Sequence, residues 1–361
     1  MKKVIQVCVG AWALMAVGCG PSEELGANME PPAEVSARLV GGTDDQLLIY
    51  NLNTKHLSSP GTSNYEGTDY KDFIYYMNHP SRPRLPDVIV LQEVNTPGYP
   101  SCATFLSTLE SVTGANYACR YTNAQGGAAI VYRVNRLSYQ TETKWTLYKI
   151  NTSTGVCERD TGTSLWTGLA VRFVDDINGK FVNIASVHTP TDNHGPGSSE
   201  GVGDDCVWTN LKEFNAKLNG LGSAHMKILA GDLNHRDAYV TTSGHQYFEC
   251  MYKGTNVDLG GCGGTNLQFK DPMYRSCAAT NTTESAISSC LTTNHWTMAN
   301  STVDRRIDFL FVKAYSLTHQ YTIKFDDGDA ARGQPTSDTE NYSDHRGQMV
   351  LADYYGSAIS W

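Results

Sequence analysis

The sequence predicts an α/β or α+β sandwich. Three observations lead to this fold class: short apolar runs recur along the chain, amphipathic helical segments separate some of them, and polar residues follow where the runs end. At 361 residues, the chain could form one large domain or two small ones, since about 100–200 residues per domain is only a soft prior. No repeat and no linker follows residue 42, which favours a single domain over residues 44–361.

The first residues are typical of an export signal. Lys2 and Lys3 supply a short positive region, and the apolar stretch Val4–Val17 is too short to span a membrane. We therefore expect residues 1–19 to be a signal peptide. The tetrapeptide that ends in Cys19 resembles the lipobox of bacterial lipoproteins, which predicts a lipid tether on Cys19 at the cell envelope. Free secretion is the alternative.

Residues 20–43 are rich in Pro, Glu, Gly and Ala and are expected to form a flexible spacer. Eight cysteines follow this spacer, and an even number in an exported chain predicts disulfides. They are residues 102, 119, 157, 206, 250, 262, 277 and 290. Sequence neighbours suggest Cys102–Cys119 and Cys277–Cys290, although about 105 pairings are open. Their spacing does not suggest zinc. The region 250–300 is expected to be a long loop stapled by disulfides.

The chain is acidic, with a formal net charge of −9. Removal of Lys2 and Lys3 with the signal leaves 26 basic and 37 acidic residues, a charge of −11. Tight polyanion binders usually carry a basic face, so this balance counts against tight, metal-free binding of nucleic acid. It does not exclude an enzyme whose metal ion supplies positive charge at the phosphate.

The apolar runs are rich in Val, Ile, Leu and Phe and are bounded by turn-forming residues, as buried strands are. They span Leu47–Tyr50, Val88–Leu91, Ala128–Tyr132, Leu169–Phe173, Phe181–Val187, Ile228–Ala230 and Ile307–Val312. Two segments, Tyr70–Met77 and Cys206–Leu218, place apolar residues on one face at helical spacing.

Acidic, amide and imidazole residues fall at the ends of these predicted strands. They are Asn51, Glu93, His188, Asp232, Asn234 and Asp308, followed near the C-terminus by Asp344 and His345. Strand ends at one edge of a sheet converge, so these side chains can build one site. Carboxylate and amide oxygens suit hard cations such as Mg²⁺, and histidines suit proton transfer near neutral pH. The pattern predicts metal-assisted phosphodiester hydrolysis.

Most of these residues also have an ordinary structural explanation when taken singly. Asp232-Leu233-Asn234 is a common turn signal, and His188 could be a hydrogen-bonded core histidine. Asp308 differs, because an acid within an apolar strand must be paired or bind something. The joint arrangement at successive strand ends decides for a functional site.

In order, five motifs resemble the signature of the endonuclease/exonuclease/phosphatase superfamily over about residues 47–355. They are Tyr50-Asn51, Leu91-Gln92-Glu93-Val94, Gly231-Asp232-Leu233-Asn234, Arg306-Ile307-Asp308 and Ser343-Asp344-His345. Two more segments, 131–138 with Arg133 and 186–190 with His188, are most similar to pancreatic-type deoxyribonucleases and their bacterial toxin relatives.

The resemblance implies a four-layer sandwich, two packed mixed β-sheets flanked by helices, acting as a monomer on nucleic acid. It implies Mg²⁺ as cofactor, with Mn²⁺ or Ca²⁺ as alternatives. By resemblance, Asn51, Glu93 and Asp344 hold the metal, His345 is the general base polarised by Asp308, and His188 assists the leaving oxygen. Asp232 and Asn234 orient the scissile phosphate, and Arg133 binds a neighbouring phosphate.

The chain departs from the deoxyribonucleases at the partner of His188. Those enzymes place a glutamate there, whereas segment 120–124 has no carboxylate, so either Asn123 substitutes or another acid reaches His188. The glycine-containing insert from Asp192 to Asp205 is either a substrate lid or a tolerated surface loop.

Three functions fit the sequence: an exported nuclease for DNA, or RNA; a phosphodiesterase for phospholipid, sphingomyelin or phosphoinositide headgroups; and an inactivated sandwich that binds a partner. A lipid-active enzyme should expose an apolar hairpin, for which Trp145, Leu147 and Tyr148 are the candidate. We expect the nuclease, because the predicted site is complete except for the missing glutamate.

Overall fold

The computed structural model describes most of the expected domain in separate stretches. These are residues 44–54, 70–79, 84–94, 101–123, 127–151, 153–162, 165–190, 202–234, 251, 267–298, 306–324, 327, 343 and 345–360. The predicted signal peptide and the whole of the predicted spacer lie outside them. None of the helices in these stretches has the length and apolar character needed to cross a membrane.

Two large mixed sheets form the centre of the fold. The six-stranded sheet has the order β12-β13-β1-β2-β4-β3, and the five-stranded sheet has the order β11-β10-β9-β8-β5. The first contains β1 (Gln46–Asn53), β2 (Val88–Gln92), β3 (Tyr117–Tyr121), β4 (Ala129–Arg133), β12 (Leu317–Thr322) and β13 (Gln348–Asp353). The second contains β5 (Leu137–Thr146), β8 (Thr167–Asp175), β9 (Phe181–His188), β10 (Met226–Asp232) and β11 (Asp308–Lys313).

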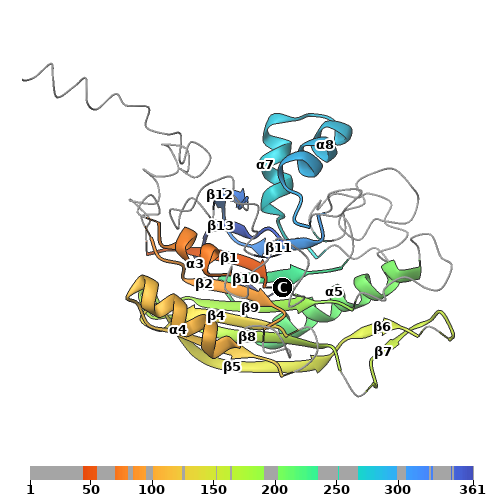
Figure 1. The fold of residues 1–361 in the computed structure, drawn as a ribbon, viewed down its shortest axis with the longest axis horizontal. Helices are drawn as coiled ribbons and strands as arrows, with labels where there is room; N and C mark the ends of the chain where they lie inside the picture. The colour runs from red at the N-terminus through yellow and green to blue at the C-terminus, as the bar shows by residue number, and fades with distance from the viewer. Residues whose placement is uncertain are drawn as a thin grey trace, which may run out of the picture.

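The two sheets and their helices make four layers (Figure 1). One face of β1 and β2, with Ile49 and Val90, packs against Val171 and Ile184 of the other sheet. The opposite face of the six-stranded sheet packs on α3 (Tyr70–Met77) and α4 (Cys102–Thr113). The outer face of the five-stranded sheet packs on α5 (Val202–Gly220). Alternation of inward and outward side chains along each strand feeds both cores, and the predicted four-layer sandwich is confirmed.

The strand directions place several strand ends together. In the first sheet β1 runs parallel to β2, with Asn53 opposite Gln92. In the second sheet β9 runs parallel to β10, which places His188 opposite Asp232. Strand β11 runs antiparallel to β10 and begins where β10 ends, so Asp308 also lies opposite Asp232. One edge of the sandwich therefore collects the polar residues that follow the apolar runs.

Three disulfides join described cysteines. Cys102–Cys119 and Cys277–Cys290 are confirmed, and Cys157–Cys206 is a third. Cys250 and Cys262 lie outside the described residues. Cys157 belongs to β7 (Cys157–Arg159), which pairs with β6 (Tyr148–Ile150) in a two-stranded sheet that projects beyond β5 (Figure 1). The disulfide ties this hairpin to α5.

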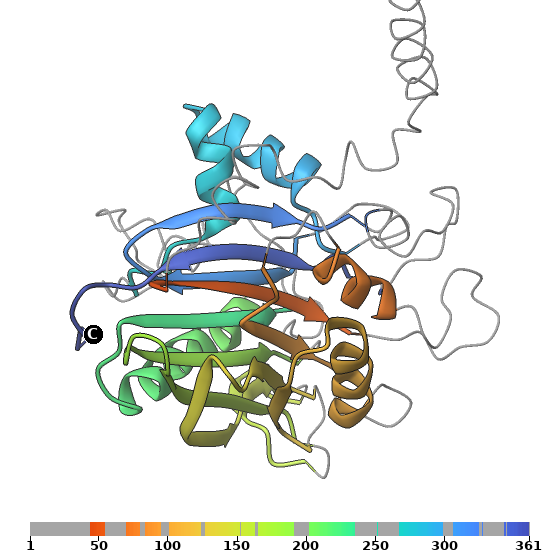
Figure 2. The same cartoon turned by 90° about the vertical axis from the view of Figure 1, so that its left-hand side faces the viewer.

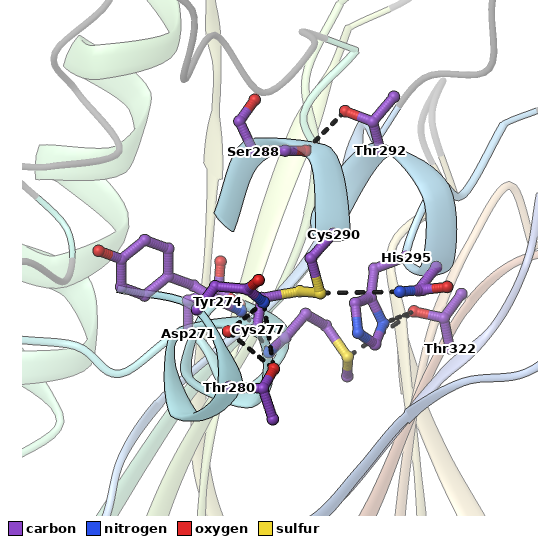
Figure 3. Close-up of a disulfide and its surroundings, with 12 residues drawn as sticks. Asp271, Tyr274, Cys277, Thr280, Ser288, Cys290, Thr292, His295 and Thr322 are labelled. Carbon is purple, nitrogen blue, oxygen red and sulfur yellow. Dashed lines mark hydrogen bonds between the residues drawn. A yellow bond between two sulfur atoms is a disulfide. The ribbon is translucent and has the colours of Figure 1, made fainter. Parts of the chain in front are cut away.

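The prediction of one long loop over residues 250–300 is wrong for its second half. That part contains α7 (Pro272–Thr280) and α8 (Glu284–Asn294), which stand beyond β12 (Figures 1 and 2). Asp271 caps α7 by accepting hydrogen bonds from two backbone N–H groups, and Thr283 caps α8 by accepting one from Ala286. The Cys277–Cys290 disulfide joins the two helices (Figure 3). The two N-caps and the disulfide thus stabilise α7 and α8, although their amino-acid composition is typical of loops.

The buried carboxylate of Asp87 stabilises the start of β2, at the opposite end of the strand from the polar residues of the sandwich edge. Asp87 is fully buried, and its two oxygens contact Arg133 at 2.5 Å and Arg84 at 2.8 Å. The backbone N–H of Leu48 also donates to Asp87. One side chain therefore ties β1, β4 and the entry to β2 together.

We predict that Asp87→Ala lowers the free energy of unfolding by about 3 kcal/mol, because it leaves two guanidinium groups and an N–H without their acceptor. Urea unfolding of residues 20–361 measures the change. Asp176→Ala is the matched control, since Asp176 is exposed, and should change stability by no more than about 0.5 kcal/mol. Equal effects of the two substitutions would contradict the anchoring role of Asp87.

Candidate active site

A histidine and an aspartate form a buried pair at the collected strand ends. His345 lies shortly before β13, Asp308 begins β11, and the two are only 2% and 1% exposed. Nδ1 of His345 lies 2.7 Å from Oδ2 of Asp308. Because a carboxylate accepts, the imidazole donates through Nδ1, which makes Nε2 the nitrogen that can accept a proton. The pair therefore has the arrangement of an oriented general base.

Asp232 lies at the centre of the cluster. Its Oδ2 accepts a hydrogen bond from Asn53 at 2.9 Å and lies 3.9 Å from Nε2 of His345 and 3.6 Å from Nε2 of His188. Its Oδ1 accepts from the backbone N–H of Asn234 at 2.6 Å. Burial, and after it the charge of Asp308, raise the pKa of Asp232 to about 6, while the two histidines act in the opposite direction.

Glu93 and His188 complete the cluster on the side of β2 and β9. Oε1 of Glu93 accepts a hydrogen bond from Asn53 at 3.2 Å and lies 3.8 Å from Nε2 of His188. Two acids, Glu93 and Asp232, therefore approach His188, whereas Asn123 is exposed. The sequence left open whether Asn123 or another acid reaches His188, and the structure places these two acids there.

The donor set fits a divalent cation. Asp232, Asp308 and His345 each offer a ligand atom, all within 4.8 Å of one another. Among the described residues, the ion pairs of Glu93, Asp232 and Asp308 are with histidines only. The second oxygen of Asp308 is buried and has no described hydrogen-bond partner. Three carboxylates that have no lysine or arginine partner among the described residues need positive charge, which a hard cation supplies.

Two residues of the cluster adopt backbone conformations that L-residues rarely take. Glu93 has φ 60°, directly after β2, and Asn234 has φ 48°, just after β10. Such left-handed residues cost of order 1 kcal/mol or more and occur where the surrounding structure holds a side chain in a required direction. The amide of Asn234 donates to the Thr189 carbonyl at 2.7 Å, so Asn234 joins the ends of β9 and β10 beside Asp232.

Asn53, rather than Asn51, contacts the acids. Asn51 was predicted to bind the metal, but its amide nitrogen donates to the Phe309 carbonyl and its amide oxygen accepts from Gln92. The first contact joins the two sheets and the second joins β1 to β2, so neither contact places Asn51 against the acids. Asn53 lies two residues further along β1, on the same face of the strand, and bridges Glu93 and Asp232. Asn53 is the last residue of β1, and this position at the strand end is the feature of the sequence that indicates its place at the site.

Arg133 is not brought to the site, which corrects the phosphate-binding role predicted for it. It ends β4, which runs antiparallel to β2, and it pairs with Asp87. Asp87 precedes Glu93 by six residues, so Arg133 lies about 20 Å from the cluster along an extended strand. The structure therefore gives Arg133 a stabilising contact at the opposite edge of the sheet.

Two predicted features lie partly or wholly outside the described residues. Asp344 is one, although its neighbours Ser343 and His345 are described and buried. Most of the insert from Asp192 to Asp205 is the other. Its last residues belong to α5, which begins at Val202.

A second group of potential ligands, Cys277, Cys290 and His295, lies at α7 and α8. Its two sulfurs form a disulfide, and Nδ1 of His295 lies 3.0 Å from Oγ1 of Thr322 (Figure 3). Disulfide sulfurs do not provide the thiolates that metals bind. This group is therefore a structural cross-link.

Comparison with known proteins agrees with the geometry. The model of the Endonuclease/Exonuclease/phosphatase family matches residues 51–345, which include every described residue of the cluster. No curated protein matches the chain.

Solved structures of the same fold cover most of the chain. An endonuclease/exonuclease/phosphatase from Bacteroides vulgatus superposes with a TM-score of 0.53 at 14% identity, covering 86% of this chain and 99% of its own. The human Nocturnin catalytic domain with bound sulfate gives 0.53 at 10% identity, covering 86% and 95%. TDP2 of D. rerio complexed with single strand DNA product gives 0.50 at 14% identity, covering 85% and 98%. At these identities the similarity shows the fold.

We predict that Asn53→Ala weakens Mn²⁺ binding by about 10–100-fold, because it removes the amide that orients two carboxylates. Calorimetric titration of Mn²⁺ into residues 20–361 measures the affinity. Asn51→Ala is the matched variant: it should lower stability, since it breaks one contact between the sheets and one between β1 and β2, and change Mn²⁺ affinity much less. Similar losses of affinity in both variants would contradict the assignment of Asn53.

Proposed function

Because the chain belongs to the endonuclease/exonuclease/phosphatase family, whose members are phosphodiester hydrolases, we propose that it is an exported, divalent-metal-dependent endonuclease that hydrolyses DNA. The observation that carries the proposal is the buried His345–Asp308 pair: Nε2 of His345 lies 3.9 Å from Oδ2 of Asp232, and the three residues together could hold a metal ion.

His345 would act as the general base. Asp308 accepts a hydrogen bond from Nδ1–H and so directs Nε2 toward Asp232. A water molecule between Nε2 and the phosphorus would lose its proton to this nitrogen as it attacks. The Asp308 carboxylate would stabilise the imidazolium that forms, as the aspartate does in other acid–histidine pairs.

His188 would act on the other side of the phosphate. It is 4% exposed, and its Nε2 faces the carboxylates of Glu93 and Asp232. Through this nitrogen the imidazole would hydrogen-bond to the leaving oxygen and give it a proton. The two histidines would then move protons in opposite directions, His345 from the attacking water and His188 to the leaving oxygen.

Glu93 and Asp232 would hold the cation, Mg²⁺ or, as alternatives, Mn²⁺ or Ca²⁺. Asn53 would orient both carboxylates, and Asp344 is a further predicted ligand. A divalent cation bound here would stabilise the charge that builds on the non-bridging phosphate oxygens. Asn234, at the end of β10, would orient the phosphate beside Asp232.

Nucleic acid as substrate is supported by the comparison and allowed by the charge. One structural neighbour is described as complexed with single strand DNA product, and RNA is the nearest alternative. The acidic chain, with a formal charge of −9, would depend on the cation for phosphate binding. Export, with a lipid on Cys19 or with release, rests on the N-terminal sequence.

A lipid-headgroup substrate receives less support. The apolar residues proposed for a membrane hairpin are mostly internal, since Trp145 is 8% exposed and Leu147 is fully buried. Tyr148 lies under the guanidinium of Arg159, 4.5 Å from its ring centre. Core packing and a cation–π contact account for all three.

We predict that the mature chain, residues 20–361, nicks supercoiled plasmid with Mg²⁺ and that a chelator abolishes the nicking. His345→Ala should lower the rate by about 10²–10⁴-fold, because it removes the general base. Gel electrophoresis of the plasmid over time measures the rate. His225→Ala is the matched control, since Nδ1 of His225 accepts the backbone N–H of Phe181 at the other end of β9.

Two results would contradict the proposal. One is equal nicking by His345→Ala and by the unaltered chain. The other is no nicking by folded, Mn²⁺-binding protein, after which sphingomyelin and phosphoinositides are the substrates to test.

A further inference from the structure

A tryptophan lies against one of the two active-site histidines. The ring of Trp166 meets the ring of His188 edge to face, with centroids 4.7 Å apart and an angle of 86° between the planes. Nε2 of the same imidazole faces Glu93 and Asp232. Trp166 is only partly buried, so an indole borders the site next to the histidine assigned to the leaving oxygen.

The backbone of Trp166 is fixed on both sides. Its N–H donates to Oδ2 of Asp160 at 3.0 Å, and its carbonyl accepts from Leu147 at 2.8 Å. Asp160 also accepts from the backbone of Gly162 and forms an ion pair with Lys149 at 2.7 Å. The indole therefore has a defined position before a substrate arrives, which lowers the entropic cost of using it for binding.

The hairpin beside Trp166 is itself held to α5. The Cys157–Cys206 disulfide joins them, and Asn210 exchanges two hydrogen bonds of 2.9 Å with the backbone of Tyr148. Arg159 contacts Glu213 at 2.7 Å. A disulfide, an amide and an ion pair thus support the segment that carries the indole.

The charged groups near the Trp166 indole favour stacking of a substrate ring on the indole over binding of a substrate phosphate by the hairpin. The cations of the hairpin, Lys149 and Arg159, are already in ion pairs with Asp160 and Glu213. These charged side chains also make the hairpin unsuitable for insertion among lipid chains. A rigid, partly exposed indole is a surface on which a planar ring stacks, and nucleobases are the planar rings next to phosphodiesters.

The base that reaches this indole must be unpaired. In a duplex the faces of the bases are covered by their neighbours, and a side chain at the level of the phosphate does not reach them. Because Trp166 touches the histidine of the leaving side, the base concerned belongs to the nucleotide on that side of the scissile bond.

We propose that Trp166 is a specificity residue that stacks the unpaired base on the leaving side of the scissile phosphate, so that the substrate is single-stranded or locally unpaired nucleic acid. This proposal rests on the nuclease function and on the assignment of His188 to the leaving oxygen.

The test uses two single-stranded oligonucleotides with one cleavable phosphodiester between uncleavable methylphosphonates. One carries a base on the leaving side and the other carries an abasic residue there. With Mg²⁺, the mature chain should cleave the first with a kcat/KM about tenfold higher, mostly through KM. Trp166→Ala should remove this preference, and Trp166→Phe should retain it. The ratio of the two substrates cancels any general effect of the substitution on His188 or on folding.

Leu165→Ala is the matched control, because Leu165 is the neighbouring residue and is 37% exposed. It should keep the preference. Annealing the first oligonucleotide to its complement should lower cleavage by the unaltered chain. Cleavage without base preference, or a preference that survives in Trp166→Ala, would overturn the inference and leave the nuclease function standing. Cleavage of neither oligonucleotide, nor of plasmid, would overturn both.

Discussion

Three carboxylates within one buried edge of the sandwich set the requirements for the rest of the site. Glu93, Asp232 and Asp308 come from different strands, and their described ion pairs are with histidines alone. Their mutual repulsion disfavours the fold at neutral pH unless protons or a cation compensate. Burial, and after it the charge of Asp308, raise the pKa of Asp232. The site is thus built for a positive charge, and the acidic composition of the chain does not conflict with an anionic substrate.

The strand topology explains how such a cluster can be held. Parallel pairing of β1 with β2 and of β9 with β10 brings four strand ends to one edge, and antiparallel β11 starts there. Contacts between the sheets, such as Asn51 with the Phe309 carbonyl and Gln348 with the Asp308 carbonyl, set the separation of the two halves. Large apolar cores on three sides stabilise the edge, which lets left-handed residues such as Glu93 persist.

The sequence predicted the sandwich, the principal buried strands and most of the cluster, because apolar runs followed by polar residues are local signals. It did not distinguish Asn51 from Asn53, since both lie on one face of β1 and only the contacts between the sheets separate them. It misplaced Arg133, because its antiparallel pairing is a long-range property. The contact of Trp166 with His188 joins strand ends whose register no local pattern reveals. Helices α7 and α8 depend on caps and a cross-link, which composition does not show.

Anomalous diffraction from crystals of the mature chain soaked in Mn²⁺ tests the central claim most directly, because it locates the cation without reference to activity. The account predicts a peak in contact with the carboxylates of Glu93 and Asp232, close to Asn53, and its loss in the Asp232→Asn variant. A peak confined to surface carboxylates such as Asp45 or Asp176, with none at the strand ends, would contradict the claim that this edge of the sandwich is a metal-dependent active site.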